Sequence, residues 1–183
     1  SFGEDVPRLR DACYALDEKV KVVVYLPGCP PHPDQVFEAL TALATGSPLN
    51  LPGRSVCDHC PTVREGKGQL KTLRRFLQSP HYKAPDEPLD KMRCILEQGM
   101  LCMGPVTRAG SGGSKIVPRC ITARVPCRGC YGPVKQNGNQ RLDMLNALAS
   151  NGIDISSLPE TVSLLRFSGA HHQLRPPRKK QEA

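Results

Sequence analysis

Two short stretches set the character of this chain: residues 56–61 read VCDHCP and residues 126–133 read PCRGCYGP. Each holds two cysteines separated by two residues, a spacing that brings two thiolates to one metal centre. Cys94, Cys102 and Cys120 lie between the two stretches, in a segment rich in glycine and proline. Apolar periodicity is poor there, so we expect bound metal to supply part of the folding free energy.

The spacing of the two pairs favours iron–sulfur clusters over zinc. Residues 61–126 separate Cys60 from Cys127, whereas a four-cysteine zinc motif places its pairs about 15 to 20 residues apart. Iron–sulfur clusters take thiolates from scattered positions, and glycine and proline let the backbone approach the sulfurs closely. A zinc-stabilised interaction module with a basic surface stays an alternative, and a set of reactive thiols is a more distant one.

Composition excludes several classes of protein. The chain has 183 residues, 39% of them apolar, which is enough for one ordinary domain or two small ones. Its longest apolar run, residues 22–26, is far shorter than the roughly 18 residues of a membrane span. Nine cysteines cannot all pair in disulfides. No paired carboxylates, Ser-His-Asp order or phosphate-binding loop occurs, which disfavours catalysis on an organic substrate.

The apolar pattern divides the chain into four parts. In residues 1–46, the run 20–26 predicts a buried strand and residues 34–45 a helix that Gly46 ends, together the last unit of a doubly wound α/β domain. Residues 47–138 predict an irregular, loop-rich metal domain with few short helices, one of them over 68–78. Residues 139–170 begin with a closing helix over 140–151, capped by Asn139, and residues 171–183 form a basic tail.

Four motifs in register carry a resemblance to a known family. They are GCPPHPD at 28–34, VCDHCP at 56–61, CILEQGMLCMGPVTRAG at 94–110 and PCRGCYGP at 126–133. Over residues 1–133 the chain resembles the small subunit of nickel–iron hydrogenases, most closely the cytoplasmic methyl-viologen-reducing type that works with heterodisulfide reductase. The resemblance implies that the strand and helix of residues 1–46 end a flavodoxin-like domain.

The resemblance also implies a function. It points to a cytoplasmic electron-transfer subunit with no bond-making chemistry of its own and no membrane span. Its partners would be a nickel–iron large subunit and a heterodisulfide-reductase-linked or flavin acceptor, with no nucleic acid. A relay that serves a non-hydrogenase oxidoreductase stays an alternative.

The ligands are carried over from the family's motifs residue by residue. The resemblance assigns Cys57, Cys60, Cys94 and Cys102 to a distal 4Fe–4S cluster, Ser111, Cys120, Cys127 and Cys130 to a medial cluster, and Cys29 to a shared proximal cluster. Ser111 departs from the family, which has a cysteine there, so the medial site is expected to hold an altered cluster, such as 3Fe–4S. Ser114 is an alternative ligand, and Cys13, which matches no motif, is expected to be a packed side chain.

The positive charge fits this interpretation. The formal net charge is +8, and residues 104–142 hold seven basic residues and no acidic one. A 4Fe–4S core held by four thiolates carries a net charge of about −2, which basic surroundings stabilise. We therefore expect the basic excess to offset cluster charge in part. The four Tyr, four Phe and no Trp are also too few and scattered for base stacking.

Overall fold

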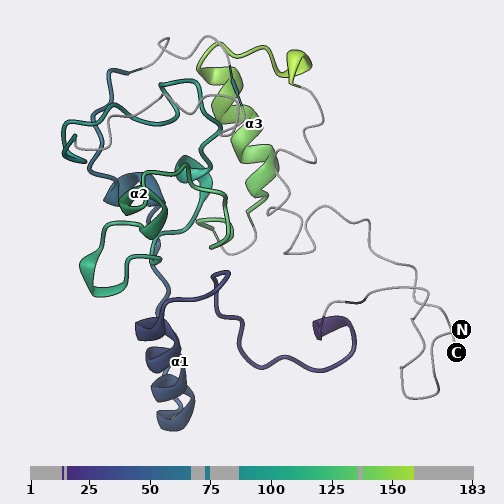
Figure 1. Ribbon diagram of the computed structural model, residues 1–183. Helices are drawn as coiled ribbons and strands as arrows, with labels where there is room; N and C mark the ends of the chain where they lie inside the picture. Colours follow the sequence, from purple (N-terminus) through teal and green to yellow (C-terminus); the bar gives the residue numbers. More distant parts are fainter. Residues whose placement is uncertain (1–13, 15, 67–72, 75–86, 136–137, 159–183) are drawn as a thin grey trace, which may run out of the picture.

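Three helices and a series of single turns make up the described part of the chain (Figure 1). The computed structural model describes residues 14, 16–66, 73–74, 87–135 and 138–158. The helices are α1 (Pro33–Thr45), α2 (Arg119–Thr122) and α3 (Gln140–Ser150). The 3-10 turns are η1 (Leu16–Glu18), η2 (Val56–His59), η4 (Gly104–Val106), η5 (Gly113–Lys115) and η6 (Ile155–Ser157). Between them the described residues form loops joined by isolated β-bridges.

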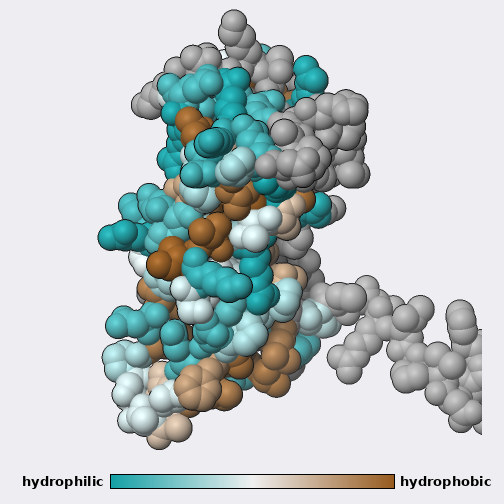
Figure 2. All heavy atoms as spheres, turned by 60° about the vertical axis from the view of Figure 1, so that its left-hand side comes forward, coloured by the Kyte–Doolittle hydropathy of each residue, from teal (hydrophilic) through white to brown (hydrophobic). Residues whose placement is uncertain are grey.

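Helix α1 forms where the sequence predicts it. Pro33 occupies its first turn, and the His32 side chain caps it by accepting the Asp34 N–H at 3.2 Å. Gly46, at φ 68°, ends the helix in the left-handed conformation that glycine adopts readily. The helix projects away from the cysteine-bearing loops, and apolar side chains gather at that lower end of the molecule (Figures 1 and 2). Four of its apolar residues are exposed: Val36, Phe37, Leu40 and Leu43.

The strand predicted over residues 20–26 does not form. These residues are irregular, with Val23 80% and Tyr25 64% exposed. A buried strand of a parallel sheet needs neighbouring strands for its hydrogen bonds and for cover on both faces. No described segment pairs with residues 20–26, which explains the difference. The doubly wound domain therefore stays a prediction.

Helix α3 closes the cysteine-bearing loops. The Asn139 side chain caps it by accepting the Leu142 N–H at 3.0 Å, as predicted. The spacing of Leu142, Leu145 and Leu148 predicts one apolar face, but only part of it is buried: Leu148 is buried together with Met144, whereas Leu142 is 54% exposed. The helix predicted over 68–78 falls mostly outside the described residues, as do residues 159–183. None of the helices that the structure describes has the length and hydropathy needed to cross a bilayer.

Backbone hydrogen bonds hold the described loops of residues 54–133 against one another. The Val56 N–H donates to the Thr107 carbonyl at 2.8 Å, and the Met103 N–H donates to the Cys127 carbonyl at 2.8 Å. Side chains fill the space between these loops in two apolar clusters. The first is built around Val56, Cys102, Met103, Cys127, Met144 and Leu148, and the second around Met92, Ile95, Met100 and Ile121. Cys102 and Cys127 thus lie in the core.

Candidate metal centre

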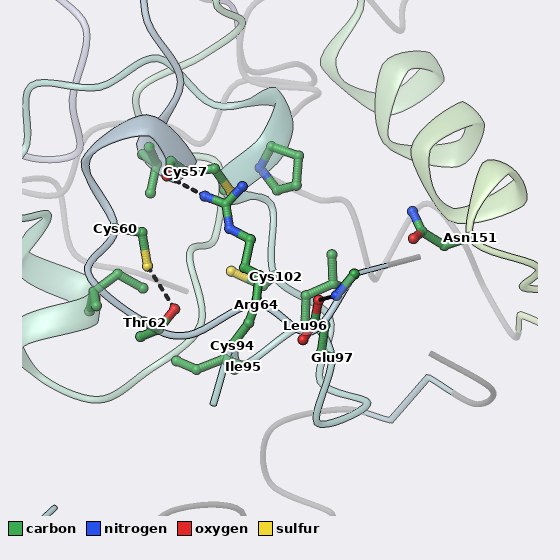
Figure 3. A pocket seen from close by; sticks show the side chains of 15 residues that line it. Cys57, Cys60, Thr62, Arg64, Cys94, Ile95, Leu96, Glu97, Cys102 and Asn151 are labelled. Carbon is green, nitrogen blue, oxygen red and sulfur yellow. Dashed lines mark hydrogen bonds between the residues drawn. The ribbon is translucent and has the colours of Figure 1, made fainter. Parts of the chain in front are cut away.

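Four cysteines from three separate loops line one cavity (Figure 3). They are the four that the resemblance assigns to one cluster: Cys57, Cys60, Cys94 and Cys102. The cavity measures about 240 Å³, and apolar side chains such as Ile95, Leu96 and Ile121 complete its wall. The structure thus gathers the predicted distal set around a common, mostly apolar space.

The first two cysteines are placed by the turn η2. The Ser55 backbone N–H and hydroxyl both donate to the Asp58 carboxylate, at 2.7 and 2.9 Å. The Cys60 N–H closes the turn on the Cys57 carbonyl at 3.3 Å. This reciprocal cap satisfies the start of a turn too short to be stable on its own, and it brings both thiols to the cavity.

Cys94 and Cys102 reach the cavity from the following loops. The Cys94 N–H donates to the Val63 carbonyl at 2.7 Å, which ties its loop to the chain that follows Cys60. Cys102 lies just before η4, where Gly104 packs directly on the thiols. A Cβ atom at Gly104 would lie 3.0 Å from the Cys57 sulfur and 3.6 Å from the Cys102 sulfur. The glycine therefore leaves room at the sulfurs that a side chain would fill.

Burial favours the neutral form of three of these thiols, those of Cys57, Cys94 and Cys102, in the absence of metal. It raises the pKa of Cys57 to about 12, even though the Arg64 guanidinium acts in the opposite direction. Burial also raises the pKa of Cys94, and that of Cys102 well above its usual range. Thiolate ligands in this cavity need a positive counter-charge, which a metal centre supplies.

Charged side chains shape the mouth of the cavity. The Arg64 guanidinium donates to the Cys57 carbonyl across the cavity (Figure 3). The Glu97 carboxylate accepts the backbone N–H groups of Glu65 and Gly66, at 2.7 and 3.0 Å. Arg93 forms an ion pair with Glu65 at 3.0 Å. These contacts fix the loop after Cys60 over the cavity opening.

The three cysteines of the predicted medial set lie close to one another. The neighbouring Cys120 thiol and burial raise the pKa of Cys127 well above its usual range. Cys130 lies near both Cys127 and Cys29, and burial, followed by the neighbouring Cys127 thiol, raises the pKa of Cys130. Cys29 is exposed. The single cysteine predicted for a shared proximal cluster therefore adjoins the predicted medial set.

Ser111 lies half-buried in the loop that leads into η5. This loop packs on the start of α1: the Ser114 N–H donates to the Asp34 carboxylate at 3.0 Å, and Gly113 lies directly against His32. Ser111 and Cys29 are thus carried by segments that lie side by side. The role of Ser111, or of Ser114, as a fourth ligand stays a prediction.

One hydrogen bond connects the two cysteine sets. The Cys127 backbone N–H donates to the Cys102 sulfur at 3.3 Å. Two buried residues that sequence reasoning missed lie behind Cys127: the Gln140 side chain donates to the Thr107 hydroxyl at 2.8 Å. Gln140 starts a helix and Thr107 follows a glycine-rich turn, so no periodic or spacing signal marks either as buried.

The donor set fits a cluster. No three His, Cys, Asp or Glu side chains within the described ranges converge closely enough to bind a single ion. The four thiols of the distal set instead surround a shared cavity, with a glycine where a Cβ would crowd the Cys57 sulfur. Soft thiolates in a mostly apolar wall are the ligands that iron–sulfur clusters use.

Several known proteins with similar sequences are hydrogenase subunits, although no family model matches. The chain is 35% identical over 167 residues to a subunit of the F420-non-reducing hydrogenase vhu of Methanocaldococcus jannaschii, covering 91% of this chain and 53% of the relative. It is 33% identical over 157 residues to the iron-sulfur subunit of the F420-non-reducing hydrogenase of Archaeoglobus profundus, covering 81% and 45%.

A more local similarity reaches a different kind of hydrogenase. Over 51 residues the chain is 41% identical to the HoxS delta subunit of the NAD-reducing hydrogenase of Cupriavidus necator, covering 28% of this chain and 24% of that protein. The chain spans about half the length of the first two relatives. Over most of its length it is therefore homologous to hydrogenase subunits, one of which is named as an iron–sulfur subunit.

Proposed function

We propose that this chain is the cluster-bearing part of an electron-transfer subunit of a nickel–iron hydrogenase complex. In this proposal Cys57, Cys60, Cys94 and Cys102 hold a distal 4Fe–4S cluster. The observation that carries it is that all four line one cavity although they come from three loops. The hydrogenase relatives support the class of complex.

Residues around the four distal cysteines provide a suitable environment for a negatively charged cluster. A bound cluster supplies a one-electron carrier whose potential depends on its ligands, hydrogen bonds and solvent exposure. Ile95, Leu96 and Ile121 give the cavity a mostly apolar wall, and Gly104 leaves space at the Cys57 sulfur. Arg64 brings the positive charge nearest to Cys57, which favours the thiolate form of that ligand.

The second cluster is assigned to Cys120, Cys127 and Cys130, with Ser111 as a fourth ligand or with a three-iron cluster in its place. Cys29 would contribute to a third, proximal cluster shared with the rest of a longer protein. The position of Cys29 beside Cys130 supports neighbouring centres. The proposed route runs from a nickel–iron large subunit, through these centres, to a heterodisulfide-reductase-linked or flavin acceptor.

The exposed face of α1 supports the view that residues 1–46 end a flavodoxin-like domain. Phe37 is 72% and Leu40 60% exposed, and in a doubly wound domain such a face packs on the sheet. Replacing both with serine should reduce binding of an apolar dye to the 183-residue chain without lowering its thermal midpoint. A drop in the midpoint would show that the face is already packed and would overturn this view.

Iron content and spectroscopy of ligand variants test the proposal. The anaerobically purified full chain should be brown and hold about eight irons, or about seven with a three-iron medial cluster. Cys94→Ala should lose the iron and electron paramagnetic resonance signal of one cluster, and Cys130→Ala those of the other. Cys13→Ala, which removes a cysteine that matches no motif, is the matched control and should keep both.

Two outcomes would favour the alternatives. A colourless protein with stoichiometric zinc would replace the relay with a zinc-stabilised interaction module. A protein with both clusters whose native complex takes up no hydrogen would instead be an electron relay of a non-hydrogenase oxidoreductase.

A further inference from the structure

The loop that follows Cys60 carries an arginine to the mouth of the distal cavity. We call residues 63–66 of this loop the strap. Arg64 lines the cavity together with the four distal cysteines, and its guanidinium donates to the Cys57 carbonyl (Figure 3). Ordering an arginine side chain costs conformational entropy, so a fixed backbone at Arg64 favours this position.

The start of the strap is fixed by the chain that carries Cys94. The Val63 N–H donates to the Met92 carbonyl at 2.9 Å, and the Val63 carbonyl accepts the Cys94 N–H at 2.7 Å. Both bonds lie before Arg64 in the sequence. They therefore do not by themselves fix the backbone that follows the arginine.

Glu97 holds the strap beyond Arg64. One oxygen of its carboxylate accepts the Glu65 N–H at 2.7 Å, and the other accepts the Gly66 N–H at 3.0 Å. The Glu97 side chain is only 12% exposed. Hydrogen bonds to an ionised acceptor are roughly twice as strong as those between neutral groups. Arg64 thus lies between two anchored stretches of backbone.

The place of Glu97 in the sequence connects the two halves of the distal set. It lies in the turn 95–99, between the second pair of distal cysteines, whereas the strap follows the first pair. Arg93 supports the contact, because its guanidinium lies 3.0 Å from the Glu65 carboxylate and 4.0 Å from that of Glu97. Ion pairs as exposed as that of Arg93 and Glu65 add little stability, so the two bonds to Glu97 are the main support of the strap here.

We propose that Glu97 is a positioning residue for Arg64, and that Arg64 raises the reduction potential of the distal cluster. This rests on the proposed function, because it takes the four cysteines of the cavity as ligands of that cluster. Reduction adds one negative charge to a cluster, so a guanidinium nearby stabilises the reduced form more than the oxidised form. Arg64 held at the cavity therefore makes the distal potential less negative.

Redox titration of the iron-loaded full chain, followed by electron paramagnetic resonance, tests the effect of Arg64. The distal signal is the one that Cys94→Ala removes. Arg64→Gln removes the charge and should make the distal midpoint more negative, while the medial midpoint stays. Arg64→Lys keeps a charge on a more flexible stem and should give a distal midpoint between those of wild type and Arg64→Gln.

Arg108→Gln is the matched control. The Arg108 guanidinium also donates to a backbone carbonyl, that of Pro52 at 2.9 Å, but Arg108 lies outside the described lining of the distal cavity. This variant loses the same charge and the same kind of bond, and it should leave the distal midpoint unchanged. Equal shifts of the distal midpoint in Arg64→Gln and Arg108→Gln would overturn the inference.

A double-mutant cycle tests the role of Glu97. Glu97→Ala on its own combines two opposite effects, because release of Arg64 makes the distal midpoint more negative and loss of a carboxylate makes it less negative. The cycle separates them, since the carboxylate's own charge acts whether or not Arg64 is present. Arg64→Gln should shift the distal midpoint much less in the Glu97→Ala background than in wild type. Equal shifts in the two backgrounds would show that Glu97 does not act through Arg64.

Hydrogen exchange of the metal-free chain checks the contact directly. The Glu65 and Gly66 amides should exchange more slowly in wild type than in Glu97→Ala, because this variant removes their acceptor. The Val63 amide has a backbone acceptor and should exchange at the same rate in both. Equal rates at Glu65 and Gly66 would overturn the positioning role whatever the cluster content.

The failures of the two proposals are distinguishable. If wild-type protein holds a distal cluster and Arg64→Gln keeps its midpoint, the inference is wrong and the proposed function stands. If Glu97→Ala binds no distal cluster, Glu97→Gln, which replaces one acceptor oxygen by a donor, takes its place in the cycle, and an undiminished Arg64→Gln shift there decides against the inference. If wild-type protein binds no distal cluster, the distal assignment fails and the inference with it.

Discussion

At the scale of single residues, the contact between Gly104 and the thiols decides how much space the distal cavity offers. At Gly104 the backbone of η4 approaches the Cys57 sulfur more closely than a residue with a Cβ atom would allow. A Cβ contact of 3.0 Å is too short for van der Waals packing with sulfur, so the sulfur or the turn would have to move.

We expect Gly104→Ala to weaken cluster binding at the distal site. Overpacking of this kind costs about 1–3 kcal/mol, and here the added Cβ would press directly on the Cys57 sulfur. Iron per chain and the distal electron paramagnetic resonance signal should both fall. Gly53→Ala is the control, because no atom lies within 4 Å of the Cβ it would add. Equal iron content in the two variants would contradict this role of Gly104.

At the scale of elements, short capped turns position the cysteine side chains of the candidate site. In η2 the Asp58 carboxylate receives both the N–H and the hydroxyl of Ser55, and these bonds lower its pKa. A related cap occurs in η6, where the aspartate is itself the N-cap: the Asp154 carboxylate accepts the N–H and hydroxyl of Ser156. Of these two turns, η2 alone carries cysteine ligands.

Asp58→Asn should therefore affect metal binding, whereas Asp154→Asn should not. An amide oxygen is a weaker acceptor than a carboxylate, and loss of such a cap costs about 0.5–1 kcal/mol. Both variants should be slightly less stable, but only Asp58→Asn should lose iron faster to a chelator, because it loosens the turn of Cys57 and Cys60. Equal rates of iron loss would show that the cap acts on stability alone.

The sequence predicts an element well when the interactions that form it lie within a few residues of one another. Helices α1 and α3 follow from apolar spacing and from caps within a few residues, so they form as expected. The strand over 20–26 depends on neighbours that no described segment provides, and its prediction is wrong for this structure. The buried face of α3 is set by packing against the cysteine loops, which turns Met144 inward in place of Leu142.

The candidate site likewise depends on contacts between distant residues. The spacing of the cysteines predicts a metal site but does not distinguish iron–sulfur clusters from zinc. Only the resemblance to the hydrogenase family groups Cys57 and Cys60 with Cys94 and Cys102. The cavity brings these four together. The contact between Thr107 and Gln140 joins positions 33 apart through a single hydrogen bond, and nothing in the local sequence of either residue marks it.

At the scale of the whole molecule, neutral buried thiols make the metal-free fold sensitive to alkali. Burial raises the pKa of Cys57 from its ordinary 9.0 to about 12, and the pKa of Cys102 and Cys127 rises as well. Between these values the folded chain keeps protons that the unfolded chain releases. Rising pH therefore favours unfolding.

We expect the reduced, metal-free chain to keep this stability below pH 9 and to lose it as the pH rises towards 12. The denaturant midpoint should be lower at about pH 10 than at about pH 7.5. Cys57→Ala, which removes one of the raised groups, should show a smaller pH-dependent loss. A wild-type midpoint that is unchanged or higher in the more alkaline buffer would contradict the direction of these pKa shifts.

The hydrogen bond from the Cys127 amide to the Cys102 sulfur connects the two proposed ligand sets directly. Both residues are buried, so this amide should be among the last in the chain to exchange with deuterium. Any substitution at Cys102 changes the acceptor of that amide, and any shift of the backbone at Cys127 moves a donor away from a sulfur of the other set. A substitution at either of the two proposed sites should therefore also be felt at the other.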